Sequence, residues 1–213
     1  MDFPDIAPDL LPEGAVCLVA ADGTPTHRVI AEIPTGLGPE GAAIDAAQRR
    51  AFVASSRSDE ITVLDLEQMK AVGRVPVGQE PTDAVFDARR QRLFVCNLRA
   101  SSVTVIDTRR LWPEATVAVP GYPSSLTLDP DRRVLYCGCA AGAVVAVIDV
   151  DDLRLVTTIS AEFGAGGTAV DTRRQVAYCV NFLADSITVI DCQSREPIDR
   201  IEVGRAPCAA IVN

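Results

Sequence analysis

The segment LFVCNLRASSVTVID, from Leu93 to Asp107, decides the fold because its pattern returns at one fixed interval. An aromatic residue inside a short apolar run recurs every 42 residues, at Phe52, Phe94, Tyr136 and Tyr178. A second run follows each aromatic and closes on an aspartate, at Asp65, Asp107, Asp149 and Asp191. Repeats of about 40–45 residues are typical of β-propeller blades. The interval therefore predicts an all-β propeller.

Each repeat has the pattern of four short strands. In the second repeat they span 82–86, 92–96, 103–106 and 115–119, and turn-forming residues separate them. The strands alternate apolar and polar residues or are wholly apolar, as half-buried and fully buried strands are. This spacing leaves no room for helices. We therefore expect four-stranded antiparallel blades, lettered a to d from the channel outward.

The chain length predicts five blades in a single domain, 1–213. Five periods of 42 residues nearly fill the 213-residue chain. Four blades are expected at 37–78, 79–120, 121–162 and 163–204, and the fifth is expected to combine 205–213 with 4–36. In that closing blade, 207–212 would be strand a, the weak run near Leu10–Leu11 strand b, and 16–20 and 28–33 strands c and d. Closure by both termini would remove free sheet edges.

Two ladders of aspartates mark the turns. One is the set that ends the c-strands, and the other ends the a-strands at Asp45, Asp87, Asp129 and Asp171. An aspartate after a strand can accept hydrogen bonds from backbone N–H groups two residues on. We expect turn capping, because the spacing of an EF-hand calcium loop is absent from the sequence.

The tetrads Phe94-Val95-Cys96-Asn97 and Tyr178-Cys179-Val180-Asn181 resemble the Tyr-Val-Thr-Asn signature of the YVTN β-propeller repeat family. The similarity continues into SSVTVID and DSITVID and covers essentially the whole chain. It implies a β-propeller and no particular chemistry, because propellers serve binding, scaffolding and catalysis alike.

Composition limits the partners. A net charge of -9 and a pI near 4.6 argue against nucleic acid and anionic membrane surfaces as partners. The sequence has no apolar run near the roughly 20 residues of a membrane span, and its start lacks the features of a secretory signal. Seven cysteines then favour a reducing cytoplasm over a disulfide framework. We expect a bacterial cytoplasmic protein without a cofactor.

The candidate catalytic residues are three acids, Asp83, Glu80 and Glu162. They fall on inner strand a or on the d-to-a corners, which meet the b-to-c loops at one end of the channel. Asp83 departs from the repeat, since its counterparts are Gly41, Ser125, Gly167 and Ala209. A carboxylate among small residues leaves room for a ligand, and burial that raised its pKa would make it a general acid or base. The alternative is that Asp83 accepts hydrogen bonds from nearby backbone amides.

The candidate ligand-binding residues come from the same loops. They combine an acid, three arginines, two aromatic residues and a thiol that replaces the signature asparagine: Glu40, Arg57, Arg99, Arg205, Tyr122, Phe163 and Cys139. No metal site is predicted, because Cys137 and Cys139 lack the paired spacing and histidine of usual zinc sites. We expect the cysteines to pack as small apolar residues.

Two functions remain open on this basis. The first is a soluble propeller that binds a small polar molecule at the channel mouth. Whether it is also an acid/base enzyme of lyase, cyclase or hydrolase type, as in bacterial specialised metabolism, is left open. The second is a non-catalytic scaffold whose loops bind another protein. Uneven loops bearing charged and aromatic residues favour the first, because function concentrates in loops held by a rigid scaffold.

Overall fold

The computed structural model describes residues 14–19 and 29–212, and these residues form strands and turns without a helix. Sixteen of the strands build four antiparallel four-stranded sheets, each in chain order. The first sheet is β3 (Pro39–Asp45), β4 (Arg50–Ser55), β5 (Glu60–Asp65) and β6 (Lys70–Pro76). The second is β7 (Pro81–Asp87), β8 (Arg92–Asn97), β9 (Ser102–Asp107) and β10 (Trp112–Ala118). The third is β11 (Pro123–Asp129), β12 (Val134–Cys139), β13 (Val144–Asp149) and β14 (Arg154–Ser160). The fourth is β15 (Ala165–Asp171), β16 (Val176–Asn181), β17 (Ser186–Asp191) and β18 (Glu196–Glu202).

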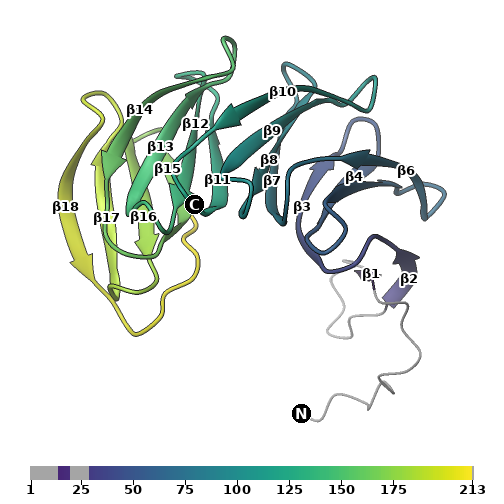
Figure 1. Cartoon of the computed structure of the whole chain (residues 1–213), viewed down its shortest axis with the longest axis horizontal. Helices are drawn as coiled ribbons and strands as arrows, with labels where there is room; N and C mark the ends of the chain where they lie inside the picture. Colours follow the sequence, from purple (N-terminus) through teal and green to yellow (C-terminus); the bar gives the residue numbers. More distant parts are fainter. Residues whose placement is uncertain (1–13, 20–28, 213) are drawn as a thin grey trace.

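The sheets stand side by side in an arc (Figure 1). Strands β3, β7, β11 and β15 line its concave side, and β6, β10, β14 and β18 lie outside. The predicted all-β fold of four-stranded antiparallel blades is thereby confirmed in its coarse form. The described residues contain no helix that is long and apolar enough to cross a bilayer.

Apolar layers between adjacent sheets hold the arc together. Each sheet has a forward face, toward the next sheet in the chain, and a rear face, toward the preceding one. On the forward face of the first sheet, Phe52, Ile61 and Val75 pack against Leu93 and Ile106 on the rear face of the second. The next two junctions repeat this packing with their own apolar residues. Since each layer is sealed from water, burial of apolar area stabilises every junction.

The aspartate ladders cap turns, as predicted. Asp87 Oδ1 accepts hydrogen bonds from the N–H groups of Arg89 (2.9 Å) and Arg90 (3.3 Å), and Asp107 Oδ1 does the same with Arg109 and Arg110. The same pair of bonds occurs at the other six ladder positions: Asp45, Asp65, Asp129, Asp149, Asp171 and Asp191. Amide donors stabilise the charged carboxylate, which is why the pKa of Asp107 lies below its ordinary value.

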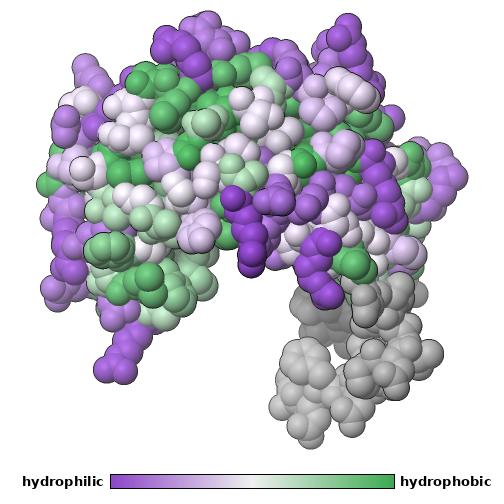
Figure 2. Space-filling model, viewed as in Figure 1, coloured by the Kyte–Doolittle hydropathy of each residue, from purple (hydrophilic) through white to green (hydrophobic). Residues whose placement is uncertain are grey.

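The predicted closing blade is not formed. Strands β1 (Ala15–Val19) and β2 (Val29–Pro34) match the expected strands c and d, but they pair with each other as a two-stranded sheet at the start of the arc. The segment 207–212, expected as strand a, contains no strand and lies at the other end. The expected strand b near Leu10–Leu11 falls outside the described residues. A count of five blades is therefore not confirmed, because the arc stays open between its ends (Figures 1 and 2).

The concave side is crowded enough to require small residues. Gly138 on β12 lies so close to β15 that a Cβ there would overlap the carbonyl group of Gly166. Gly204, at the end of the fourth repeat, would meet nothing within 4 Å. Neither glycine has a positive φ, so the two differ in space and not in backbone strain.

We expect Gly138→Ala to destabilise the protein strongly. Relief of the overlap must push the third and fourth sheets apart, and overpacking of this kind costs about 2 kcal/mol or more. Thermal unfolding should shift down by about 4–8 °C for a chain of this size. Gly204→Ala is the matched control and should leave the transition within about 1 °C of wild type. Equal shifts in the two variants would show that the sheets do not approach as closely as described.

Candidate functional site

The main hollow on the concave side lies where the repeat is interrupted. It has a volume of about 520 Å³ and is formed by β11, β15, the loop after β16 and the segment 207–210. In β15 the sequence Ala165-Gly166-Gly167 occupies positions that carry larger residues in β7 and β11. The absent side chain of Gly166 leaves space there, and the hollow is of the size that small-molecule sites have.

A cluster of hydroxyl groups crosses from β11 to β15 at this hollow. Thr127 Oγ1 lies 3.0 Å from Thr168 Oγ1 and donates to the Thr168 carbonyl oxygen at 2.7 Å. The Thr168 N–H donates to Ser125 Oγ at 3.2 Å. Beside them Ser124 Oγ, which is also part of the wall, is buried and has no hydrogen-bond partner among the described residues. A buried hydroxyl normally has a partner, so Ser124 retains hydrogen-bonding capacity that the described residues do not satisfy.

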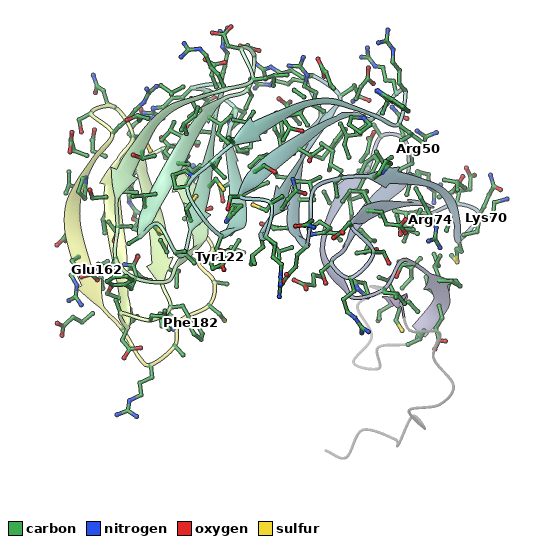
Figure 3. The ribbon with its side chains drawn as sticks, in the orientation of Figure 1. Arg50, Lys70, Arg74, Tyr122, Glu162 and Phe182 are labelled. Atoms are coloured by element: carbon green, nitrogen blue, oxygen red, sulfur yellow. The ribbon has the colours of Figure 1, made fainter. Side chains whose placement is uncertain are left out.

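The rim of the hollow is apolar and exposed. Phe182 and Leu183 in the loop after β16 belong to its lining and are 47% and 70% exposed, and nearby Phe163 is 69% exposed. Figure 2 shows a hydrophobic patch at the lower end of the arm formed by β15–β18, where Figure 3 labels Phe182. The loop is held by Gly164, whose φ of +79° and contact with the Leu183 backbone leave no room for a Cβ. Exposed apolar groups at the mouth of a hollow are typical of binding surfaces.

Asp83 serves as a link between two sheets. Its Oδ1 accepts the Ala84 N–H at 2.8 Å, and its Oδ2 accepts the Leu126 N–H of the next sheet at 2.9 Å. The carboxylate thus bonds backbone amides, as the structural alternative expected. Burial raises the pKa of Asp83 even though the two amides act in the opposite direction. A raised pKa suits an acid or base, but both oxygens are engaged, and Asp83 does not line the hollow.

Three of the predicted residues meet elsewhere. Arg57, Glu80 and Arg99 line a separate hollow of about 470 Å³ between the first and second sheets. Arg99 donates to the Glu80 carboxylate in an ion pair whose arginine is 72% exposed. Because this ion pair is open to solvent, it contributes little to the stability of the protein.

The other predicted residues are scattered. Glu162 accepts hydrogen bonds from Ser186 and Arg200, and these hold the pKa of its carboxyl below the ordinary value. That direction suits a permanently charged group and not a general acid at neutral pH. The remaining loop residues are exposed and do not line the main hollow: Glu40, Tyr122, Phe163 and Arg205. Cys139 has no exposed surface, and contact with Cys137 and burial raise its pKa, so it is an unreactive thiol. Figure 3 shows Glu162 in the same arm as Phe182, whereas Tyr122 lies at the corner before β11.

Two of these residues occupy strained corners. Glu80 and Tyr122 have φ values of 55° and 59° at the corner where the first and fourth sheets carry Gly38 and Gly164. Residues other than glycine seldom adopt this left-handed conformation, and it costs of order 1 kcal/mol. The same conformation recurs at turns in all four sheets, for example at Leu111 and Leu153, so it belongs to the repeat.

The sequence did not point to Ser124, Ser125, Thr168 or Leu183. The available signal was the departure from the repeat at Ala165, where the other corners have proline, followed by two glycines. Small residues at an inner strand open space for something else. The described residues contain no group of three His, Cys, Asp or Glu side chains placed to hold a metal ion.

Comparison with known proteins supports the fold. The structure resembles Kuenenia stuttgartiensis hydrazine synthase with a TM-score of 0.73 and 21% sequence identity. The likeness covers 77% of this chain and 49% of that one, so the chain spans about half the length of its structural neighbour. At this identity the likeness shows the fold alone, and it fits a β-propeller. No family model and no curated protein matches the chain, so the YVTN resemblance stays a prediction.

We expect Asp83→Ala to lower stability by about 2 kcal/mol, because it leaves the buried Leu126 and Ala84 amides without an acceptor. Asp199, which also accepts an adjacent N–H but is exposed, provides the control Asp199→Ala. Denaturant unfolding of both variants measures the difference, and an effect of Asp83→Ala no larger than the control would contradict the linking role.

The same variant should show a specific pH dependence. Because the native pKa of Asp83 is raised above 3.8, the native protein keeps this proton to higher pH than the unfolded chain does. The contribution of Asp83 is then complete below the unfolded pKa and declines as pH rises through the native one. The difference in free energy of unfolding between wild type and Asp83→Ala should therefore become smaller as pH rises from the unfolded pKa through the native pKa. A gap that widens with pH would contradict the raised pKa.

Proposed function

We propose that this protein is a binding module, and that its concave hollow takes a small molecule with an apolar body and one polar group. The single observation that carries the proposal is the unpartnered Ser124 hydroxyl inside a hollow with an apolar rim. An apolar lining with a few placed polar groups is the usual composition of small-molecule sites.

The orientation expected for the ligand follows from the residues that line the hollow. The polar group of the ligand would reach Ser124, which has hydrogen-bonding capacity to spare. The apolar body would lie against Phe182 and Leu183 at the rim, where burial of ring and aliphatic surface contributes most of the affinity. This refines the earlier expectation of a small polar molecule, since the charged residues predicted for it lie outside this hollow.

We propose binding and not catalysis because the carboxylates of Asp83 and Glu162 already accept hydrogen bonds from other groups. Asp83 bonds two amides, and Glu162 bonds Ser186 and Arg200. A general acid or base must reach the proton that it transfers, which neither carboxylate does in this arrangement. A cytoplasmic location fits the seven free thiols, five of which are buried.

A second candidate function is protein binding through the same arm. It is favoured by the exposure of Phe163, which stands outside the hollow but beside its rim. Aromatic residues are enriched where proteins bind one another. Phe163→Ser should weaken the binding of a protein partner and leave small-molecule binding unchanged.

The experiment for the main proposal is ligand-observed NMR with a set of small aromatic alcohols, for which p-cresol is the reference probe. Ala140 lines the hollow, and Ala140→Phe should fill it and abolish the saturation-transfer signal of the probe. Ser124→Ala should weaken binding about tenfold, equivalent to about 1.4 kcal/mol for a lost hydrogen bond.

Ala184→Phe is the matched control, because Ala184 lies in the same loop as Phe182 but does not line the hollow. It should bind the probe like wild type. Signals that persist in Ala140→Phe, or that vanish equally in both phenylalanine variants, would rule out this site.

A further inference from the structure

Three sheets bury the same apolar set on their forward faces. The aromatic residues of the b-strands, Phe52, Phe94 and Tyr136, are 0% exposed. The aliphatic residues of the neighbouring c- and d-strands are at most 5% exposed: Ile61, Val103, Val145, Val75, Val117 and Ile159. In each case the following sheet covers them.

The fourth sheet presents the same set, and the described residues form no following sheet that covers it. Tyr178 and Ile187, the counterparts of Tyr136 and Val145, are only half-buried, and Ile201 on β18 is 42% exposed. These three residues line a groove of about 480 Å³ together with the end of the described chain. A forward face that is buried three times and open once lacks its partner.

The end of the described chain, which lines this groove, occupies the position of the inner strand of a following blade. Gly41 approaches the next inner strand so closely that a Cβ would lie 2.6 Å from the Thr82 carbonyl oxygen and 2.7 Å from Asp83 Cα. Gly167 stands in the same relation to Cys208 (2.9 Å) and Ala209 (3.1 Å), which lie three 42-residue periods after Thr82 and Asp83. Ala206, with φ 52°, also repeats the left-handed corner of Glu80. The segment 207–212 therefore lies where strand a of a further blade belongs.

The opposite end of the arc carries the outer half of a blade. In β1–β2, Val16 faces Ile33 across the pair as Ile61 faces Val75 in β5–β6, which identifies β1 and β2 as strands c and d. The forward face of this pair is buried on the first sheet, with Ile33 0% exposed. No described sheet packs against its rear face. Val19 is 47% exposed, whereas its counterparts are at most 1% exposed: Leu64, Ile106, Ile148 and Ile190.

The two ends of the arc are thus complementary, and they lie apart within one chain (Figure 1). We propose that the forward face of the fourth sheet binds the β1–β2 pair of a second copy of this chain, and that the reciprocal contact closes a head-to-tail dimer. Val19 of the second copy would cover Ile187 and Ile201 as Leu64 covers Ile33. Closure within a single chain would instead require bending the arc against three packed layers. Two arcs joined head to tail leave neither open face exposed, which is how heterologous contacts form closed rings.

Light scattering coupled to size exclusion tests the proposal on the 213-residue chain. Wild type should run at about twice the chain mass of 22.6 kDa. Val19→Glu and Ile201→Glu should each weaken association at least about tenfold, since a charge enters an apolar contact. Ile198→Glu is the control, because Ile198 is 56% exposed on the same strand but does not line the groove. An equimolar mixture of Val19→Glu and Ile201→Glu restores one intact contact and should recover association, which also shows that both variants fold.

Two natural thiols give an independent measurement. Cys17 on β1 and Cys208 are exposed, and the other five cysteines are buried. In the completed blade Cys17 would take the place of Thr62, Thr104 and Thr188, which are at most 5% exposed. In a Cys208→Ser background, association should therefore slow the labelling of Cys17 by maleimide at least about tenfold relative to Ile201→Glu, and the two proteins should label equally once unfolded. A monomeric mass would overturn the proposal, and so would a Cys17 that reacts equally fast in both folded proteins.

Discussion

The apolar layer between neighbouring sheets is the interaction on which the rest of the structure depends. A four-stranded sheet of this chain has two apolar faces, and stacking against a sheet on each side is what buries both. Phe52, Phe94 and Tyr136 each fill the centre of one layer and are fully buried. Stability in such an array is a sum over neighbouring contacts. The exposed Ile201 and Val19 mark where that series of contacts stops at each end.

Function is expected where the repeat departs from itself, because shared positions serve the shared layers. The two glycines of β15 do different things: Gly166 lines the hollow without a side chain, and Gly167 lets Cys208 and Ala209 approach closely. At the same strand the Thr168 N–H bonds Ser125 of the neighbouring sheet. Close packing and an open site therefore lie next to each other on one inner strand.

Sequence periodicity predicts the strands, their order and the capping aspartates, because each follows from residues within one repeat. It does not predict closure, because the number of periods in a chain says nothing about the angle between packed sheets. Bonding of Asp83 to backbone amides was one of the two roles predicted, but the sequence did not show that one of these amides belongs to Leu126 of the next sheet. The binding hollow was missed for the same reason: its walls come from two sheets and a loop. Contacts between repeats need the structure.

Deletion of one whole period tests most directly the claim that the layers are equivalent. Removal of residues 79–120 would bring the forward face of the first sheet against the rear face of the third. The account predicts a shorter chain with the same β-type circular dichroism per residue and a cooperative thermal transition. Removal of 79–99 alone, which takes only β7 and β8, should abolish that transition. If the 79–120 deletion gave an aggregated or non-cooperative product, the layers would not be interchangeable and the account would be contradicted.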